Sequence, residues 1–217
     1  MGLDTRLSLL SVLSGLLMIG FGLAIYVPRV RGCTVQKNEE AALRDLETIF
    51  RLEQEQQRAG GADAARFLFL PELADVRGAT HASERFRAAL RADLEGGDLR
   101  SGGYRFRVFL PDAEGHGIGH ERKDEVNESE SSVHLACYAW PERFGTTGRR
   151  TFLLVADGTI LSTENIRRRY QGRDRAPRPG SGFVAADPDR IVDCPAVVAA
   201  RDRGRGTDGQ IWRRVRT

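Results

Sequence analysis

The segment "EGHGIGHE", residues 114–121, holds the densest group of side chains that bind metals or transfer protons. Zinc prefers imidazole and carboxylate ligands, and two histidines four residues apart face the same way when they lie on a helix. Three glycines within the segment disfavour a helix there. The pattern therefore leaves two interpretations, a weak metal site built from His116, His120 and Glu121, or an exposed hairpin tip, and we expect the tip. The other acid of the segment is Glu114.

The chain contains three cysteines, Cys33, Cys137 and Cys194. Cys137 alternates with apolar residues, so we expect it to be buried or bonded to another cysteine instead of serving as a nucleophile. Cys137 and Cys194 both belong to the C-terminal part and could pair in an oxidising compartment. The sequence thus predicts a possible Cys137–Cys194 disulfide.

No other arrangement of residues indicates a reaction. The sequence has no phosphate-binding glycine loop, no dinucleotide fingerprint, and no Ser-His-Asp order in a supporting context. The arginine run at 167–169 could touch phosphate groups, but Tyr170 is the only aromatic residue beside it, so a solvated loop is the simpler interpretation. We predict a protein that is not an enzyme, has no cofactor and does not bind nucleic acid.

An uncharged apolar segment precedes these residues. After a short flank at residues 1–6, the 22 residues 7–28 lie between Arg6 and Arg29 and carry no charge. A helix of that length would span about 30 Å, the thickness of a bilayer core. The segment is too long for an ordinary signal peptide and apolar all round, unlike a helix buried in a small domain. It predicts a transmembrane anchor and a single-pass protein of the inner membrane.

The orientation of this anchor rests on two opposing observations. The basic residues that flank the segment slightly favour a cytoplasm-facing domain, by the positive-inside rule. The possible disulfide favours a domain outside the cytoplasm. We expect the extracytoplasmic orientation and keep a cytoplasm-facing regulatory domain as an alternative.

Residues 35–163 show a helical period first and strand periods afterwards. Asn38 is a plausible N-cap of an amphipathic helix that ends near Gly60. Alternating apolar residues then predict strands over 104–110, 133–139 and 151–161, the last interrupted by an Asp157-Gly158 turn. The pattern indicates an α+β domain in which the amphipathic helix packs on a small antiparallel sheet.

The remaining residues, 164–217, are rich in arginine, glycine and proline and show little periodicity. We expect this tail to be mostly loop, with a possible edge strand at 210–216.

The order of these features resembles the type IV pilin-like and pseudopilin-like proteins of bacteria, and an uncharacterised exported bacterial family with the same C-terminal sheet. The resemblance covers about residues 7–161 and rests mainly on turn-forming positions. The matching residues are Asn38, Glu39, Leu46, Gly103, Tyr104, Phe106, Ala139, Pro141, Gly148, Phe152, Asp157 and Gly158.

The resemblance implies a membrane-anchored, pilin-like module that acts through protein contacts in cell-envelope or secretion-type assembly. Its expected partners are the lipid bilayer and other envelope or pilin-like proteins. Leu7 stands where the family's processing signal has a glutamate, so we expect a fixed module and not a filament subunit. The alternative functions are a metal-binding enzyme using residues 114–121 and the cytoplasm-facing regulatory domain.

Overall fold

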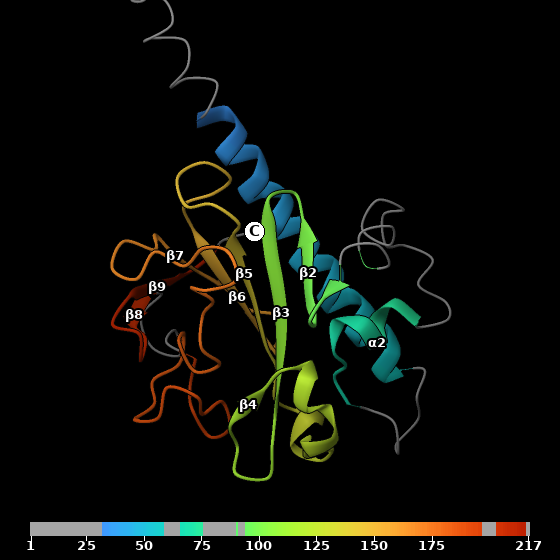
Figure 1. The fold of residues 1–217 in the computed structure, drawn as a ribbon. Helices are drawn as coiled ribbons and strands as arrows, with labels where there is room; N and C mark the ends of the chain where they lie inside the picture. The colour runs from blue at the N-terminus through green and yellow to red at the C-terminus, as the bar shows by residue number, and fades with distance from the viewer. Residues whose placement is uncertain (1–31, 59–65, 76–89, 91–93, 197–202, 216–217) are drawn as a thin grey trace, which may run out of the picture.

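The structure, a computed structural model, describes residues 32–58, 66–75, 90, 94–196 and 203–215 (Figure 1). A long helix covers residues 32–58, and the short helix α2 covers Leu70–Asp75. The strands are β1 (Leu94–Glu95), β2 (Asp98–Ser101), β3 (Tyr104–Pro111), β4 (Gly117–Ile118), β5 (Ala136–Pro141), β6 (Thr151–Val155), β7 (Ile160–Thr163), β8 (Arg203–Arg205) and β9 (Ile211–Arg214). Two 3-10 helices, η1 (His120–Glu125) and η2 (Glu130–Ser132), lie between β4 and β5.

The nine strands in the described residues belong to one antiparallel sheet. Its order is β1-β2-β3-β5-β6-β7-β9-β8, and β4 pairs with the end of β3 outside this path. The two-residue period of β3 sends Tyr104, Phe106 and Val108 to one face and Arg105 and Phe109 to the other. Both faces of the central strands are buried, so each needs its own cover.

The long helix covers the first face. Ala42, Leu46 and Ile49 are buried against the apolar side chains of β3, β5 and β6, and the helix crosses the sheet as the blue ribbon in Figure 1. Leu52 and the segment leading into α2 continue the same core. The expected amphipathic helix is therefore present and packs on the sheet through its apolar stripe.

The start of this helix differs from the prediction. The helix is already formed at residue 32, so Asn38 lies inside it and is not an N-cap. The Asn38 amide donates to the backbone oxygen of Thr147 at 2.8 Å, and Glu39 accepts the backbone N–H groups of Arg149 and Arg150. These residues tie the helix to the loop between β5 and β6.

The C-terminal segment covers the second face. Tyr170, Phe183, Ile191 and Val192 are buried with the outward side chains of β5 and β6, and Trp212 of β9 completes this second core. Residues 164–196 have little regular structure, as predicted, but they form part of the folded body (Figure 1). The possible strand at 210–216 is present as β9, although it lies inside the sheet because β8 pairs beyond it.

These observations correct the predicted fold. The sequence predicted a transmembrane helix followed by a pilin-like domain with a small sheet; the structure has a nine-stranded sheet with separate covers on its two faces. The pilin-like fold is therefore wrong. The reason is that residues 164–215 add two strands and a second core, which their composition did not reveal.

The predicted localisation is corrected as well. The anchor at 7–28 lies outside the described residues, as does the flank at 1–6. Among the residues that are described, no helix has the length and apolar character needed to cross a bilayer.

Candidate functional site

The residues predicted to do chemistry lie where the β3–β4 hairpin meets the C-terminal segment. Asp112, buried at the end of β3, accepts the backbone N–H groups of Glu114 at 3.0 Å and His116 at 2.8 Å. Gly115 has a φ of +83°, a left-handed conformation that glycine adopts without steric cost. This tight turn aims the His116 side chain toward the C-terminal segment.

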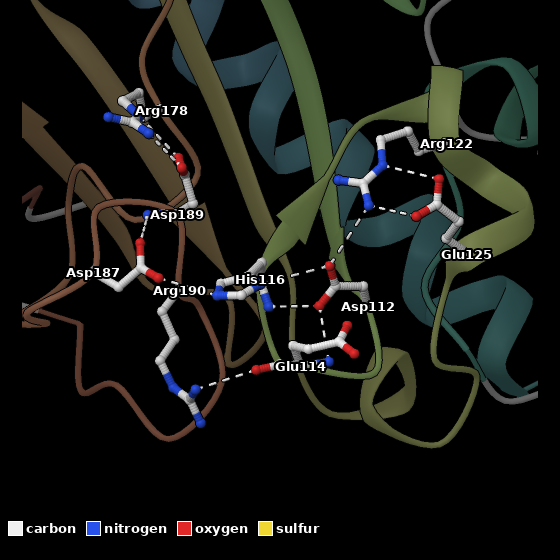
Figure 2. A network of polar contacts seen from close by, with 9 residues as sticks. All are labelled: Asp112, Glu114, His116, Arg122, Glu125, Arg178, Asp187, Asp189 and Arg190. Atoms are coloured by element: carbon white, nitrogen blue, oxygen red, sulfur yellow. Dashed lines mark hydrogen bonds and ion pairs between the residues drawn. The ribbon is translucent and has the colours of Figure 1, made fainter.

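The His116 ring lies between two carboxylates (Figure 2). Its Nδ1 is 3.7 Å from Asp112, and its Nε2 is 3.0 Å from Asp187 of the C-terminal segment. The backbone N–H of Asp189 donates to Asp187 and, with His116 nearby, holds the pKa of that carboxyl below its ordinary value. His116 therefore bridges two parts of the chain that are distant in sequence.

Arginines extend this network on both sides (Figure 2). Arg122 forms a two-pronged pair with Glu125 and lies 3.9 Å from Asp112. Its hydrogen bonds hold the pKa of Glu125 below the ordinary value. On the C-terminal side Arg178 pairs with Asp189, and Arg190 donates to the backbone oxygen of Glu114 at 3.2 Å.

The polar side chains of this network pair with one another and join the hairpin to the C-terminal segment, which is a structural role. Both ring nitrogens of His116 face carboxylates that already hold backbone or arginine partners. His120, the other predicted ligand, instead packs edge-on against Phe69 with ring centroids 5.6 Å apart, and Glu121 folds back beside Gly119. The candidates His116, His120 and Glu121 are thus not brought together, and the described part of the chain contains no group of three or more metal-binding side chains.

A second cluster of charges is also used inside the fold. Asp98 of β2 is buried and pairs with Arg105 and Arg107 of the neighbouring strand. The Arg107 guanidinium also lies 5.9 Å from the centre of the Trp140 ring. A buried carboxylate requires such partners, so these arginines neutralise charge within the sheet and are not displayed to a ligand.

The cysteines do not form the predicted bond. All three thiols are free. Cys137 is completely buried in the core beneath the long helix, whereas Cys194 lies at the margin of the core on the opposite face. Burial, with Glu53 nearby, raises the pKa of the Cys137 thiol, which makes it a poor nucleophile. The sheet itself separates Cys137 from Cys194.

Comparison of the chain with protein-family models, curated proteins and solved structures finds no match. The resemblance to pilin-like proteins stays an expectation from the residues that carried it.

The surface beside β7 and β9 exposes large apolar side chains. The large apolar side chains left exposed there are Ile166, 74 % accessible, and Ile211, 49 % accessible. They border one pocket of about 180 Å³ together with Arg167, Gln210 and Arg213. We call this the β7–β9 pocket; its other lining residues are Ser162, Thr163 and Glu164.

The loop that carries Ile166 is held in place by buried polar contacts. Asn165, fully buried and with a φ of +58°, accepts the Tyr170 N–H at 2.6 Å and donates to the Tyr170 oxygen at 2.8 Å. The Tyr170 hydroxyl donates to Asp208 at 2.8 Å, which ties the loop to the turn before β9. The exposure of Ile166 is thus built into an anchored loop.

Sequence reasoning noticed Arg167 only as part of an arginine run and missed the other residues of this pocket. Ile166 and Ile211 are single aliphatic residues in polar surroundings, a pattern that does not distinguish an exposed residue from a buried one. Gln210 and Asn165 carry no signal until the loop and the turn are placed side by side. The alternation of β9 was the one available clue, because Ile211 and Trp212 must face opposite sides of a strand.

Proposed function

We propose that the protein is a non-catalytic module that acts by binding another protein, and that the β7–β9 pocket is part of the contact surface. The observation that carries the proposal is the pair of exposed isoleucines. Four large apolar side chains are strongly exposed in the described residues, Val133, Ile166, Val184 and Ile211, and two of them border this one pocket. Clustered apolar exposure is typical of interaction sites.

The use of the polar residues elsewhere supports the same proposal. The carboxylates, His116 and the arginines of the hairpin network satisfy one another. Enzymes place perturbed acids or bases in an open cleft, beside a nucleophile or a metal. The perturbed acid Glu53 is instead buried in the core, with its carboxylate on the Leu68 N–H.

This proposal depends neither on a pilin-like fold nor on an inner-membrane location. It keeps one element of the expectation from sequence, an action through protein contacts. Whether the partner belongs to an envelope or secretion assembly stays a prediction.

Site-specific photocrosslinking tests the proposal. A benzoylphenylalanine placed at position 166 or 211 of the full chain, in the cells that make it, should give a discrete adduct with one polypeptide after irradiation. The matched control is position 184, where Val184 is 56 % exposed but lies away from the pocket. The same adduct should form when His116→Ala is added, because the hairpin network is not part of the contact.

Equal labelling at 166, 211 and 184 would mean that the isoleucines meet proteins only by random collision. No adduct at any of the three positions would likewise contradict a protein-binding role for this surface.

A further inference from the structure

The β7–β9 pocket is small. Its volume is about 180 Å³. Sites for drug-sized ligands are usually about 300–1,000 Å³. One branched aliphatic side chain with a neighbouring carboxylate matches this space; a nucleotide or a cofactor does not.

The lining combines apolar and positively charged side chains. Ile166 stands on the anchored loop and Ile211 on β9, and the two offer aliphatic contact area. Arg167 and Arg213 supply guanidinium groups that form no ion pair within the described part of the chain. Guanidinium groups bind carboxylates through paired hydrogen bonds, which suits an anionic end of an apolar ligand.

Gln210 provides an independent indication of a missing acceptor. Its side chain is 3 % exposed and borders the pocket, and its amide nitrogen has no hydrogen-bond partner. The amide oxygen accepts the Arg167 N–H at 3.3 Å, so a flipped amide would place two donors together. A buried donor without a partner is unfavourable, because it has lost its hydrogen bonds to water. Since Gln210 borders the pocket, a ligand oxygen bound there is a candidate partner for this nitrogen.

The charges around the pocket favour an anion. Glu164 also borders the pocket, but its carboxylate lies 3.9 Å from Arg150, which is not part of the lining, whereas Arg167 and Arg213 form no ion pair among the described residues. The two guanidinium groups can hold a carboxylate through paired hydrogen bonds. The ligand that fits is therefore an aliphatic group joined closely to a carboxylate.

The last residue of a polypeptide has that arrangement. Its carboxylate and its side chain share one carbon atom, and only one strand of backbone has to leave the pocket. An internal aspartate or glutamate would bring two backbone segments to a space that holds one residue. Capture of a terminal carboxylate is a recurrent mode of peptide recognition.

We propose that the β7–β9 pocket binds the C-terminal carboxylate of a partner polypeptide that ends in Leu, Ile or Val. Ile166 and Ile211 contact the terminal side chain, and Arg167, Arg213 and the Gln210 amide hold the carboxylate. This inference rests on the proposed protein-binding function and specifies which part of the partner is recognised.

Fluorescence anisotropy on the full chain tests the inference. The probes are peptides with an N-terminal fluorescein, a Gly-Ser spacer and a final Leu, Ile or Val, each made with a free and with an amidated C-terminus. We expect the free acids to bind at least tenfold more tightly than the amides. Arg167→Gln with Arg213→Gln should remove this preference, and Ile211→Ser should weaken both forms.

The strand provides matched controls. Arg214→Gln changes the next residue along β9, whose side chain points to the other face of the sheet, and should leave affinity unchanged. Val184→Ser alters an exposed aliphatic residue elsewhere and should also have no effect.

The outcomes separate this inference from the protein-binding proposal. Equal binding of acids and amides would overturn the inference, while specific photocrosslinks at 166 and 211 would still support a protein partner. If the chain bound 4-methylpentanoate but none of the peptides, the ligand would be a small carboxylic acid and not a polypeptide, and the inference would be wrong. A full effect in Arg214→Gln would show that only the net charge of the strand matters, and would also overturn the inference.

Discussion

Single residues in this protein are most informative where a polar group is buried, and Glu53 is the clearest case. Its side chain has no exposed surface, lies on the long helix in the core, and accepts the Leu68 N–H through both oxygens, at 3.2 and 3.0 Å. Burial raises the pKa of the Glu53 carboxyl well above 4.5. The folded state therefore keeps a proton on Glu53 at pH values where the unfolded chain releases it.

This pKa shift predicts a dependence of stability on pH. The contribution of Glu53 is fully present below its unfolded pKa of about 4.5 and is lost as pH rises toward the folded pKa. Glu53→Gln keeps an acceptor for Leu68 and cannot ionise. We expect its free energy of unfolding, measured in urea, to equal the wild-type value near pH 4 and to exceed it increasingly as pH rises to 8.

Two variants make this test specific. Glu40→Gln changes an exposed carboxylate of the same helix and should show no growing difference from the wild type. Glu53→Ala leaves the Leu68 N–H without an acceptor and should destabilise the fold by about 1–3 kcal/mol or more. A pH-independent difference for Glu53→Gln would mean that the carboxyl titrates normally.

At the scale of elements, the irregular segment between β7 and β8 is attached to the sheet by a few buried polar contacts. The Tyr138 hydroxyl of β5 donates to the Pro179 oxygen at 2.8 Å and accepts the Gly182 N–H at 3.0 Å. Trp140 of the same strand donates to the Gly172 oxygen at 2.7 Å. Gly182 has no space for a side chain, since an added Cβ would lie 2.4 Å from Leu153. A loop with these contacts can cover a sheet face as well as a helix does.

Tyr138→Phe should therefore loosen this cover without changing the sheet. The variant leaves the Gly182 N–H without an acceptor in a buried place, which costs about 1–3 kcal/mol. We expect a matching loss in the free energy of unfolding, together with faster hydrogen exchange at Gly182. Exchange in β3 and in the long helix should change only with global stability.

Tyr104→Phe serves as the comparison, because the Tyr104 hydroxyl donates to the backbone oxygen of Arg150 on the helix side of the sheet. It should leave the exchange of Gly182 as it is. If hydrogen exchange at Gly182 became selectively faster in both variants, the helix and the C-terminal segment would not be attached to the sheet independently of each other.

For the whole molecule, the two covers make the C-terminal segment a requirement for folding. A chain ending at residue 163 would uncover Phe109, Tyr138, Trp140, Leu153 and Leu161. Burial of each large apolar side chain contributes about 1.5–3 kcal/mol, and the total stability of a domain is about 5–15 kcal/mol. The truncated chain should lose its near-ultraviolet circular dichroism and bind a hydrophobic dye. It should show no cooperative unfolding transition on heating.

Adding residues 164–217 as a separate peptide provides the control, since it should restore part of the near-ultraviolet signal. A cooperative unfolding transition for the chain ending at 163 would instead support the domain limits of 35–163 expected from the sequence.

The periodic elements could be predicted from the sequence alone. The alternation over 104–110 and the apolar stripe of Leu46 and Ile49 predict β3 and the long helix, because these periods follow from local backbone geometry. Asp157-Gly158 similarly predicts the turn between β6 and β7. Glycine at 148 had looked only like a turn former; in the structure an added Cβ there would lie 2.1 Å from the Tyr104 hydroxyl.

The cover on the second face of the sheet could not be predicted from local sequence and became evident in the folded structure. Tyr170 and Ile191 occur in a polar, aperiodic tail, and their burial depends on contacts with strands that are distant in sequence. The packing of segments that are far apart in the sequence also brings Asp187 to His116 and Gln210 to Arg167. The first pair joins two segments of the fold, and the second borders the β7–β9 pocket. Residue type and spacing specify local geometry, whereas the pairing of distant segments is set by the packing free energy of the whole chain.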